Sequence, residues 1–190
     1  MQPIAVWAPF ARDVELAVTG TERRRLPMTA EDGGWLTADV PAELVAPEGH
    51  VDYAFHLDGD PTPLPDPRSP WQPAGVHGPS RTFDGGAFGW TDAAFVPVGL
   101  GDAVIYELHV GTFTPEGTFA AVADHLADLV ELGVTHVELM PVAAFAGRHG
   151  WGYDGVDLYA PHPTYGSPAD LQGKPFRGVP LQLWTTMIKG

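Results

Sequence analysis

Short runs of alternating hydrophobic and polar residues fill the first 58 positions and predict β-strands. Residues 4–7 and 14–18 are apolar or alternating, and residues 35–40 alternate after a Gly-containing turn at 31–34. Residues 51–57 alternate strictly, which is typical of a strand with one buried face. Strands of this length, separated by turn residues, indicate a β-sandwich.

The following segment, residues 61–80, contains seven prolines. Proline lacks the backbone N–H that a central strand or a helix interior requires. The segment is therefore either a linker or an extended strap lying on the surface of a neighbour. Its aromatic residue Trp71 and the order of the flanking segments favour the strap.

From Asp102 onward the pattern is that of a strand, a helix and a second strand. Residues 103–110 and 134–142 are apolar enough to be strands, the second ended by Pro141. Between them an apolar face recurs at spacings of three and four, formed by Phe119, Val122, Leu126, Leu129 and Val130. Thr118 suits the N-cap of that helix and Gly133 its left-handed end. The two strands should therefore be parallel, with a right-handed crossover.

A second helix is predicted to begin near Asp170 and to end almost at once. Ser167 suits the N-cap and Pro168 the first helical position. Glycines and prolines then follow, and an interior proline costs a helix about 3 kcal/mol. Both lysines lie in residues 173–190, and no acidic residue follows Asp170. We therefore expect residues 173–190 to be an aberrant tail.

Charge and composition exclude several classes of partner. The net charge of −14 repels phosphate backbones, so we expect no nucleic-acid partner. No run of about 18 apolar residues occurs, so we expect no membrane span. The absence of cysteine excludes disulfides and suits a reducing compartment, which makes the cytoplasm the expected location. The N-terminus has no signal-peptide pattern.

The histidines do not form a metal-binding pattern. No pair lies four residues apart on one helix with a carboxylate beside it, so we expect neither a metal nor another cofactor. His109 is expected in the core or at the end of its strand, and His125 at the surface. The sequence contains no GxSxG nucleophile elbow, so nothing in it indicates a Ser-His-Asp enzyme.

The strongest functional signal is the loop at 143–166, which follows the second predicted strand. In βα barrels, binding sites lie at the C-terminal ends of the strands. Trp151 and Tyr153 offer flat apolar faces for sugar rings, and Asp154 can accept hydroxyl hydrogen bonds. Arg148 and His149 can donate such bonds. These five residues are the predicted substrate-binding set.

Two further residues of the loop have competing interpretations. Asp157 could also accept hydroxyl hydrogen bonds, but the sequence Gly155-Val156-Asp157 favours simple turn chemistry. Tyr159 is as well suited to packing the loop down as to binding a ligand.

Three segments resemble the α-amylase superfamily, glycoside hydrolase family 13. They are VIYELHVGTFTPEGTF (104–119), GVTHVELMPVAAF (133–145) and GRHGWGYDGVDLYAPHPTYGSP (147–168). The last of these, with LPDPRSPWQPAGVHGPS upstream (64–80), is similar to the malto-oligosyltrehalose trehalohydrolases. The resemblance covers roughly residues 1–171.

The resemblance implies a fold in two parts. Residues 1–95 would be an all-β sandwich of the E-set, glycogen-debrancher type, carrying the Pro-rich strap. Residues 102–172 would be the first βαβ part of a truncated (β/α)8 TIM barrel. Tyr153 matches the tyrosine that stacks on the sugar where cleavage occurs, and Trp151 and Asp154 match the same motif.

The implied activity is hydrolysis of the α-1,4 bond next to the terminal trehalose of a maltooligosyl trehalose, with retention of configuration. The implied partner is therefore α-glucan or maltooligosyl trehalose. The superfamily's catalytic carboxylates come from barrel strands four, five and seven, so no catalytic residue is assigned here.

A complete barrel needs about 200–250 residues. About 70 residues lie between Asp102 and the break, so we expect this chain to be inactive, with an open sheet edge. The hypotheses that stay open are a trehalohydrolase sequence cut short near residue 172, a non-catalytic α-glucan-binding module, another superfamily member such as a glycogen branching or debranching enzyme, and a decayed gene.

Overall fold

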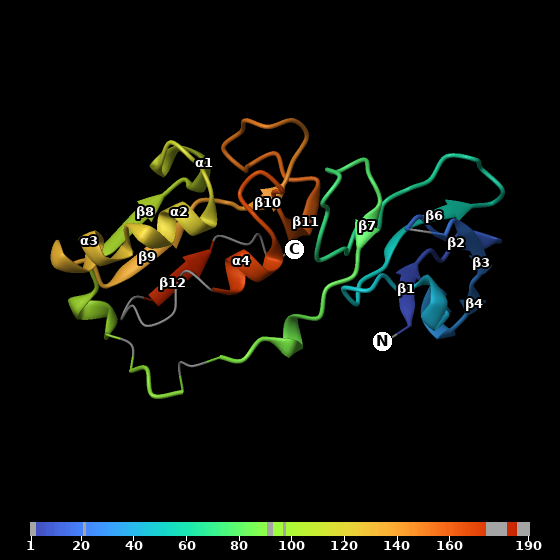
Figure 1. Cartoon of the computed structure of the whole chain (residues 1–190), viewed down its shortest axis with the longest axis horizontal. Helices are drawn as coiled ribbons and strands as arrows, with labels where there is room; N and C mark the ends of the chain where they lie inside the picture. Colours follow the sequence, from blue (N-terminus) through green and yellow to red (C-terminus); the bar gives the residue numbers. More distant parts are fainter. Residues whose placement is uncertain (1–2, 21, 91–92, 97, 174–181, 186–190) are drawn as a thin grey trace.

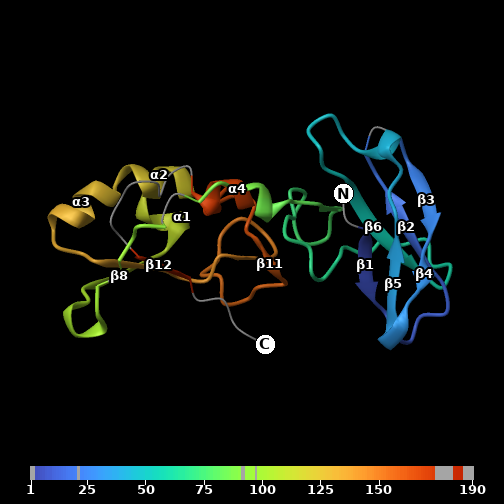
Figure 2. The same cartoon turned by 90° about the horizontal axis from the view of Figure 1, so that it is seen from below.

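The computed structural model describes residues 3–20, 22–90, 93–96, 98–173 and 182–185. These residues form a β-sandwich at one end of the long axis and a unit of parallel strands and helices at the other (Figure 1). The Pro-rich segment 61–80 lies between the two regions (Figure 1). Figure 2 shows the same separation from a second direction.

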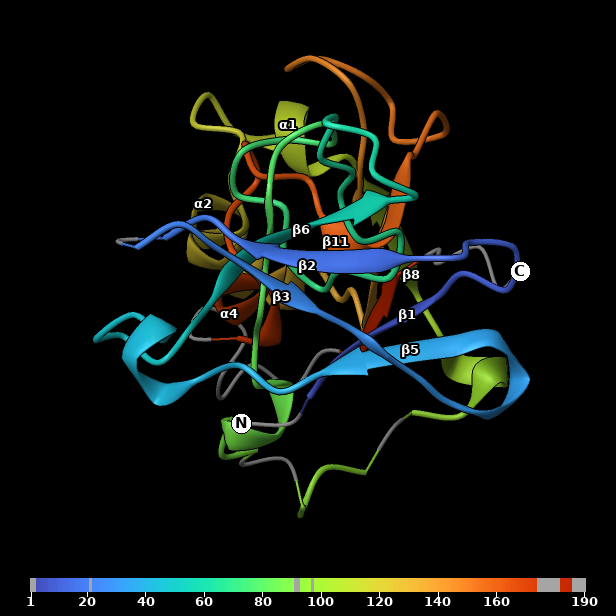
Figure 3. The same ribbon diagram turned by 90° about the vertical axis from the view of Figure 1, so that its right-hand side faces the viewer.

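The sandwich consists of two antiparallel sheets that enclose one apolar core. One sheet has the order β3-β2-β6-β7 and the other β1-β5-β4, and Figure 3 shows β2 and β6 of the first beside β1 and β5 of the second. Buried residues such as Leu16, Leu36 and Phe55 fill the space between them. The strands are β1 (Ile4–Trp7), β2 (Val14–Val18), β3 (Arg24–Pro27), β4 (Thr29–Ala30), β5 (Trp35–Ala38), β6 (Asp52–Leu57) and β7 (Ser80–Arg81).

The predicted strands at 4–7 and 14–18 are confirmed, while the strand predicted at 35–40 ends at Ala38. Strands β3 and β4 were not predicted, because they are exposed and carry no apolar alternation. Backbone pairing with β2 and β5 forms them instead. Short 3-10 helices connect the strands and lead into the second region: η1 (Asp32–Gly34), η2 (Ala42–Leu44), η3 (Gly85–Ala87) and η4 (Leu100–Asp102).

Strand β6 is more deeply buried than its alternating sequence predicted. Its four central residues, 53–56, are all buried, so the expectation of one exposed face was wrong. The chain after β6 folds back along it, because Phe55 and Leu64 exchange two backbone hydrogen bonds of 2.8 Å. The hydroxyl of Tyr53 also donates to Asp66 at 2.7 Å. Burial raises the pKa of Tyr53 strongly, so this phenol stays protonated.

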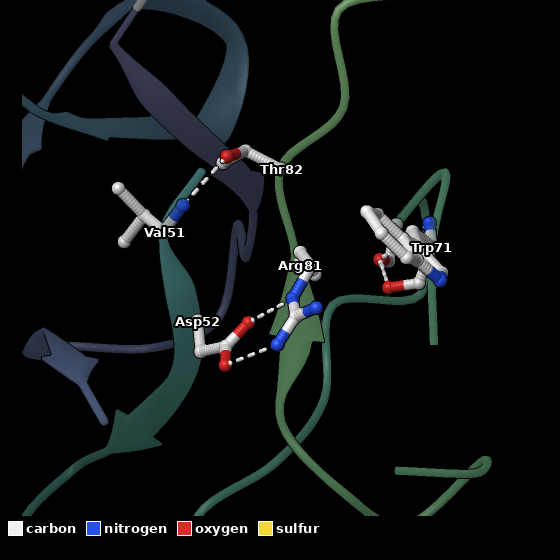
Figure 4. Close-up of polar contacts among 6 residues, drawn as sticks. Val51, Asp52, Trp71, Arg81 and Thr82 are labelled. Atoms are coloured by element: carbon white, nitrogen blue, oxygen red, sulfur yellow. Dashed lines mark hydrogen bonds and ion pairs between the residues drawn. The ribbon is translucent and has the colours of Figure 1, made fainter. Parts of the chain in front are cut away.

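The Pro-rich segment is tied to the sandwich at its far end as well (Figure 4). Arg81 donates two hydrogen bonds to the carboxylate of Asp52, at 2.6 and 2.8 Å, and its guanidinium lies 4.9 Å from the ring centroid of Trp71. The amide of Val51 donates to the hydroxyl of Thr82 at 2.9 Å. The segment is thus a strap rather than a free linker.

The second region is built on a sheet of three parallel strands in the order β12-β9-β8. The predicted parallel pairing of the first two strands is confirmed. One apolar core joins the sheet to its helices, with Phe119, Leu126 and Leu139 almost fully buried. The elements are β8 (Ile105–Leu108), α1 (Val110–Phe113), α2 (Phe119–Asp124), α3 (Leu126–Glu131), β9 (His136–Leu139), β10 (Ala143–Ala144), β11 (Asp157–Pro161), α4 (Pro168–Gln172) and β12 (Gln182–Thr185).

The strands predicted at 103–110 and 134–142 are both shorter in the structure, where they run from Ile105 to Leu108 and from His136 to Leu139. The amide of Val104 donates to the side chain of Thr135, so the regular ladder begins only at Ile105. After Leu108 the chain turns at once into α1, where the amide of Phe113 donates to the carbonyl of His109. Strand β8 lies at the edge of the described sheet, and three of its four residues are exposed.

The predicted central helix is interrupted at His125. Its N-cap is confirmed, because the Thr118 hydroxyl accepts from the amide of Ala121, and Gly133 at its end has the expected positive φ of 93°. At His125, however, the backbone leaves the helical region with ψ near 1° and separates α2 from α3. The side chain of His125 is exposed, as predicted.

The second predicted helix begins where expected and is short. Ser167 caps α4 reciprocally with Asp170, Pro168 opens it, and Gly173 ends it with a φ of 111°. Most of the predicted aberrant tail, residues 174–181 and 186–190, lies outside the described residues, and Gln182–Thr185 forms β12 beside β9. No described helix has the length and apolarity needed to cross a membrane.

The Asp52–Arg81 contact offers a direct test of the strap. We expect Arg81→Lys to lower the free energy of unfolding by about 1–2 kcal/mol, because lysine cannot form the two-pronged contact with a half-buried carboxylate. Urea unfolding of the full chain measures this. The control is Arg25→Lys, whose partner Glu15 lies on an exposed surface and which should cost less than about 0.5 kcal/mol. Equal effects of the two substitutions would contradict the prediction.

Candidate functional site

The five predicted site residues lie together on one loop between β10 and β11. Residues 146–156 form its tip, and the loop follows β9 and the short strand β10 along the chain. Trp151 and Tyr153 are 63% and 64% exposed, so their ring faces are open to solvent. Arg148, His149 and Asp154 are exposed as well. The loop therefore presents two aromatic faces. Arg148 and His149 precede them in the sequence and Asp154 follows them.

A close backbone approach at Gly152 fixes this arrangement. Gly152 has a φ of 83°, and a Cβ atom placed on it would lie 2.0 Å from the carbonyl oxygen of Pro141. No other residue fits without moving one of the two segments. The loop is thus pressed onto the end of β9 at the one residue that separates Trp151 from Tyr153.

The loop rests on His109, at the end of the neighbouring strand β8. The Nε2 atom of His109 bonds to the carbonyl of Gly150 at 2.9 Å and lies 3.1 Å from the hydroxyl of Tyr165. Its ring meets the indole of Trp151 edge to face, with centroids 5.3 Å apart. The prediction that His109 belongs to the core or to the strand end is confirmed, and its contacts support the loop from below.

A stacked aromatic pair lies deeper. The rings of Phe145 and His162 are parallel within 10° and 3.7 Å apart, and Tyr165 meets His162 edge to face. His162 is 1% exposed. Burial lowers the pKa of its imidazole, only partly offset by the negative charge of Asp154. Burial also raises the pKa of Tyr165 to about 12. Both groups are therefore neutral near pH 7.

Asp157 does not take part in a turn, so the interpretation as simple turn chemistry was wrong. It is the first residue of β11 and is buried, where it accepts a hydrogen bond of 3.2 Å from the amide group of Gln72 on the strap. Burial raises the pKa of Asp157, while Gln72 and the nearby His77 lower it. Its role in this structure is to join the strap to the site hairpin.

Tyr159 is exposed to 60%, so it does not pack the loop onto the strands beneath it. The guanidinium of Arg68 lies 5.7 Å from the ring centroid of Tyr159 and 5.2 Å from that of Trp35 on β5. Tyr159 and Tyr153 both line a small pocket of about 80 Å³ whose other walls are mostly apolar. Aromatic faces of this kind suit the apolar face of a neutral ring better than they suit an ion.

Four supporting residues were not predicted: Gln72, Phe145, His162 and Tyr165. The hydrogen bonds that hold them span 17 to 85 positions of the sequence, so no local pattern indicates them. Among the described residues, no three His, Asp or Glu side chains are grouped closely enough to hold a metal ion. The described loop therefore offers stacking faces and hydrogen bonds.

Comparison with known proteins gives the site a context, although no protein-family model matches the chain. A malto-oligosyltrehalose trehalohydrolase of Rhizobium sp. (strain M-11) is 50% identical over 171 residues, which cover 88% of this chain and 28% of the relative. A 1,4-alpha-glucan branching enzyme of Vibrio cholerae is 36% identical over 184 residues, covering 88% of this chain and 25% of the relative.

Solved structures are similar over nearly the whole chain. A Salmonella typhimurium protein assigned as an alpha amylase is 42% identical with a TM-score of 0.85, covering 96% of this chain and 30% of that one. A pullulanase from Anoxybacillus sp. LM18-11, complexed with maltotetraose, has a TM-score of 0.77 at 24% identity. The match covers 96% of this chain and 32% of the pullulanase. The second likeness is one of fold alone.

These findings confirm the resemblance to malto-oligosyltrehalose trehalohydrolases. Relatives of that name are 44–50% identical over about 88% of this chain. The chain spans about 28% of their length. The structural neighbours are enzymes of the α-amylase family, and the described N-terminal region is a β domain, as predicted.

The close approach at Gly152 generates a stability prediction. Gly152→Ala should destabilise the chain by about 2–5 kcal/mol, since it adds a backbone clash to the strain of a positive φ. Gly147→Ala is the matched control, because Gly147 has a φ of 90° but nothing within 4 Å of a Cβ. The control should cost about 1 kcal/mol. Chemical unfolding followed by tryptophan fluorescence measures both, and similar costs would disprove the close approach.

The buried imidazole of His162 predicts a loss of stability in mild acid. Because its folded pKa lies below the unfolded value of about 6.5, the unfolded chain binds the proton first as the pH falls. Stability should therefore decrease below about pH 6.5, until the folded pKa is passed. In His162→Phe, urea midpoints at pH 7 and pH 5 should differ less than in the wild type. His125→Gln should leave the wild-type difference intact.

Proposed function

We propose that this chain carries part of the α-glucan-binding site of a glycoside hydrolase of the malto-oligosyltrehalose trehalohydrolase type. The observation that carries the proposal is the exposed pair Trp151 and Tyr153, held on either side of Gly152 at the end of a parallel strand. The identity of 44–50% to trehalohydrolases supports the same substrate class. The expected ligand is α-glucan or maltooligosyl trehalose.

The chemistry of the loop suits a neutral sugar. A glucose ring has apolar C–H faces that stack on aromatic rings and hydroxyl groups at its edge. In our proposal Tyr153 stacks on the sugar at the cleaved bond and Trp151 on a neighbouring part of the ligand. Asp154 accepts hydroxyl hydrogen bonds, and Arg148 and His149 donate them. The net charge of −14 leaves a neutral ligand unaffected while it repels nucleic acid.

The reaction of the whole enzyme would be hydrolysis of an α-1,4 bond with retention of configuration, releasing trehalose. Such chemistry needs a carboxylate nucleophile and a carboxylic acid about 5–5.5 Å apart. We place these groups outside the present sequence, since the chain spans about 28% of the trehalohydrolases it matches. The described β8, α2, α3 and β9 would be the first βαβ part of their TIM barrel. The 190 residues alone would then bind glucan without cleaving it.

We further propose a cytoplasmic location, supported by the absence of cysteine from the sequence, which suits a reducing compartment. A second candidate is a branching or debranching enzyme of the same superfamily. The 36% identity to the Vibrio cholerae branching enzyme favours it, and the higher identity to trehalohydrolases favours the first proposal.

Binding of maltotetraose to the full chain tests the proposed site. Calorimetric titration should give saturable binding, and Trp151→Ala or Tyr153→Ala should weaken it about tenfold or more, because each removes a stacking face. Trp90→Ala is the matched control, since Trp90 is 62% exposed and lies far from the loop in sequence. Binding that is insensitive to the loop variants, or lost equally in the control, would overturn the assignment of the site.

An activity assay tests the second half of the proposal. The purified 190-residue chain should release no trehalose from maltotriosyl trehalose, whereas a full-length trehalohydrolase serves as positive control. Trehalose release by the chain itself would show that its catalytic groups lie within these residues.

A further inference from the structure

Two tryptophans lie side by side on the outer face of the sandwich. Trp7 of β1 and Trp35 of β5 are directly opposite each other in the antiparallel pair, a position that places Cβ atoms about 4.5–5.5 Å apart. Their neighbours Val6 and Leu36 point into the sandwich core, so the two indoles point away from it. Trp7 is 56% exposed, and its Nε1 atom donates to the carbonyl of Gly33 at 3.0 Å. The sandwich thus presents an ordered aromatic surface that its own core does not use.

The Pro-rich strap adds a guanidinium to this surface. The guanidinium of Arg68 lies 5.2 Å from the ring centroid of Trp35, within the range of a cation–π contact. The backbone of Arg68 is fixed, since its amide donates to the buried carboxylate of Asp66 at 2.8 Å. Within the described part of the chain, the guanidinium forms no ion pair and no hydrogen bond. Its five N–H groups are therefore available to a ligand.

Arg68 also connects this surface to the site hairpin. Its guanidinium lies 5.7 Å from the ring centroid of Tyr159, which is 60% exposed on β11. Tyr159 and Tyr153 line the same small pocket of about 80 Å³. A row of three aromatic rings and one guanidinium, formed by Trp7, Trp35, Arg68 and Tyr159, therefore leads from the sandwich to the proposed site at Tyr153. We refer to these four residues as the aromatic row.

The chemistry of the aromatic row suits a chain of neutral sugars. Its exposed rings can stack on the apolar C–H faces of glucose, and the guanidinium can donate hydrogen bonds to sugar hydroxyls. An anion fits less well, because the net charge of −14 repels it from the protein. A long α-glucan held at Tyr153 can continue along the aromatic row, whereas a short one ends before it.

We propose that the aromatic row is an extension of the glucan site, which binds the glucose units of a long α-glucan beyond those held at Tyr153. The inference rests on the proposed function, because the aromatic row receives the glucan chain from that site. Arg68 is the link between the two. Its ring contacts join the sandwich to the site hairpin, and its N–H groups bind sugar hydroxyls. The extension gives the protein a preference for long glucans over short ones.

Calorimetric titration of the full chain with maltotriose and with maltoheptaose tests the extension. Trp7→Ala should weaken the binding of maltoheptaose about three- to tenfold, because it removes one stacking face. It should leave maltotriose binding unchanged, since Trp7 lies at the end of the aromatic row farthest from Tyr153. Trp90→Ala is the matched control, because Trp90 is 62% exposed and lies outside the aromatic row, and it should affect neither sugar.

Two further measurements separate sugar binding from a merely structural role. Arg68→Lys keeps the positive charge near both rings and removes the planar set of donors, so it should weaken only the binding of maltoheptaose, with Arg25→Lys as the unaffected control. Equal losses for the two sugars would show that Arg68 only holds the hairpin and would overturn its proposed role. In NMR spectra of the wild type, the indole Nε1–H signal of Trp7 should shift with maltoheptaose and stay in place with maltotriose.

The outcomes distinguish the extension from the proposed function. Maltoheptaose binding that is unchanged in Trp7→Ala and Arg68→Lys, with normal maltotriose binding, would leave the glucan site standing and overturn the extension. Absence of binding of either sugar by the wild type would overturn the proposed function and this inference with it. Maltoheptaose binding that is weakened in Trp7→Ala but insensitive to Tyr153→Ala would place the glucan on the aromatic row alone. That result would overturn both the site at Tyr153 and its extension.

Discussion

Gln72, fully buried on the strap, donates a hydrogen bond to the buried carboxylate of Asp157 at the start of β11. Around it, Val76 of the strap packs on Ala144 and Ala160 of the site hairpin. Without this partner, the desolvation of the buried carboxylate would be uncompensated and would destabilise the fold. The contact therefore fixes the hairpin, and with it the loop at 146–156, relative to the sandwich.

The strap can do this because it is anchored on both sides. Its start pairs with β6 through Leu64, and its end is clamped by the contact of Arg81 with Asp52. Proline restricts the backbone of the unfolded chain, so the strap loses little further freedom on folding. Gln172 of α4 also donates to the carbonyl of Gly85, the first residue of η3. The two regions are thus linked by several polar contacts.

The site combines an exposed surface with a buried foundation. Trp151 and Tyr153 keep their faces in solvent, while His109 packs edge to face on Trp151 and the neutral His162 stacks on Phe145. In the function proposed above, such a platform would recognise the shape and apolar faces of a ring rather than its charge. The proposed sugar ligand is consistent with the similarity of this chain to a trehalohydrolase and a glucan branching enzyme. The chain matches about a quarter of the length of each.

The sequence alone determined the elements with a local signal. Alternation predicted β1 and β2, the hydroxyl of Thr118 and the pair Ser167-Pro168 predicted helix starts, and the aromatic residues of the loop suggested a candidate site. These features depend on neighbours within a few positions. Tertiary structure alone decided the burial of both faces of β6, the break at His125, the buried role of Asp157 and the exposure of Tyr159. Most of these depend on partners far away in sequence, such as Leu64, Gln72 and Arg68, whose distances are set only when the chain folds.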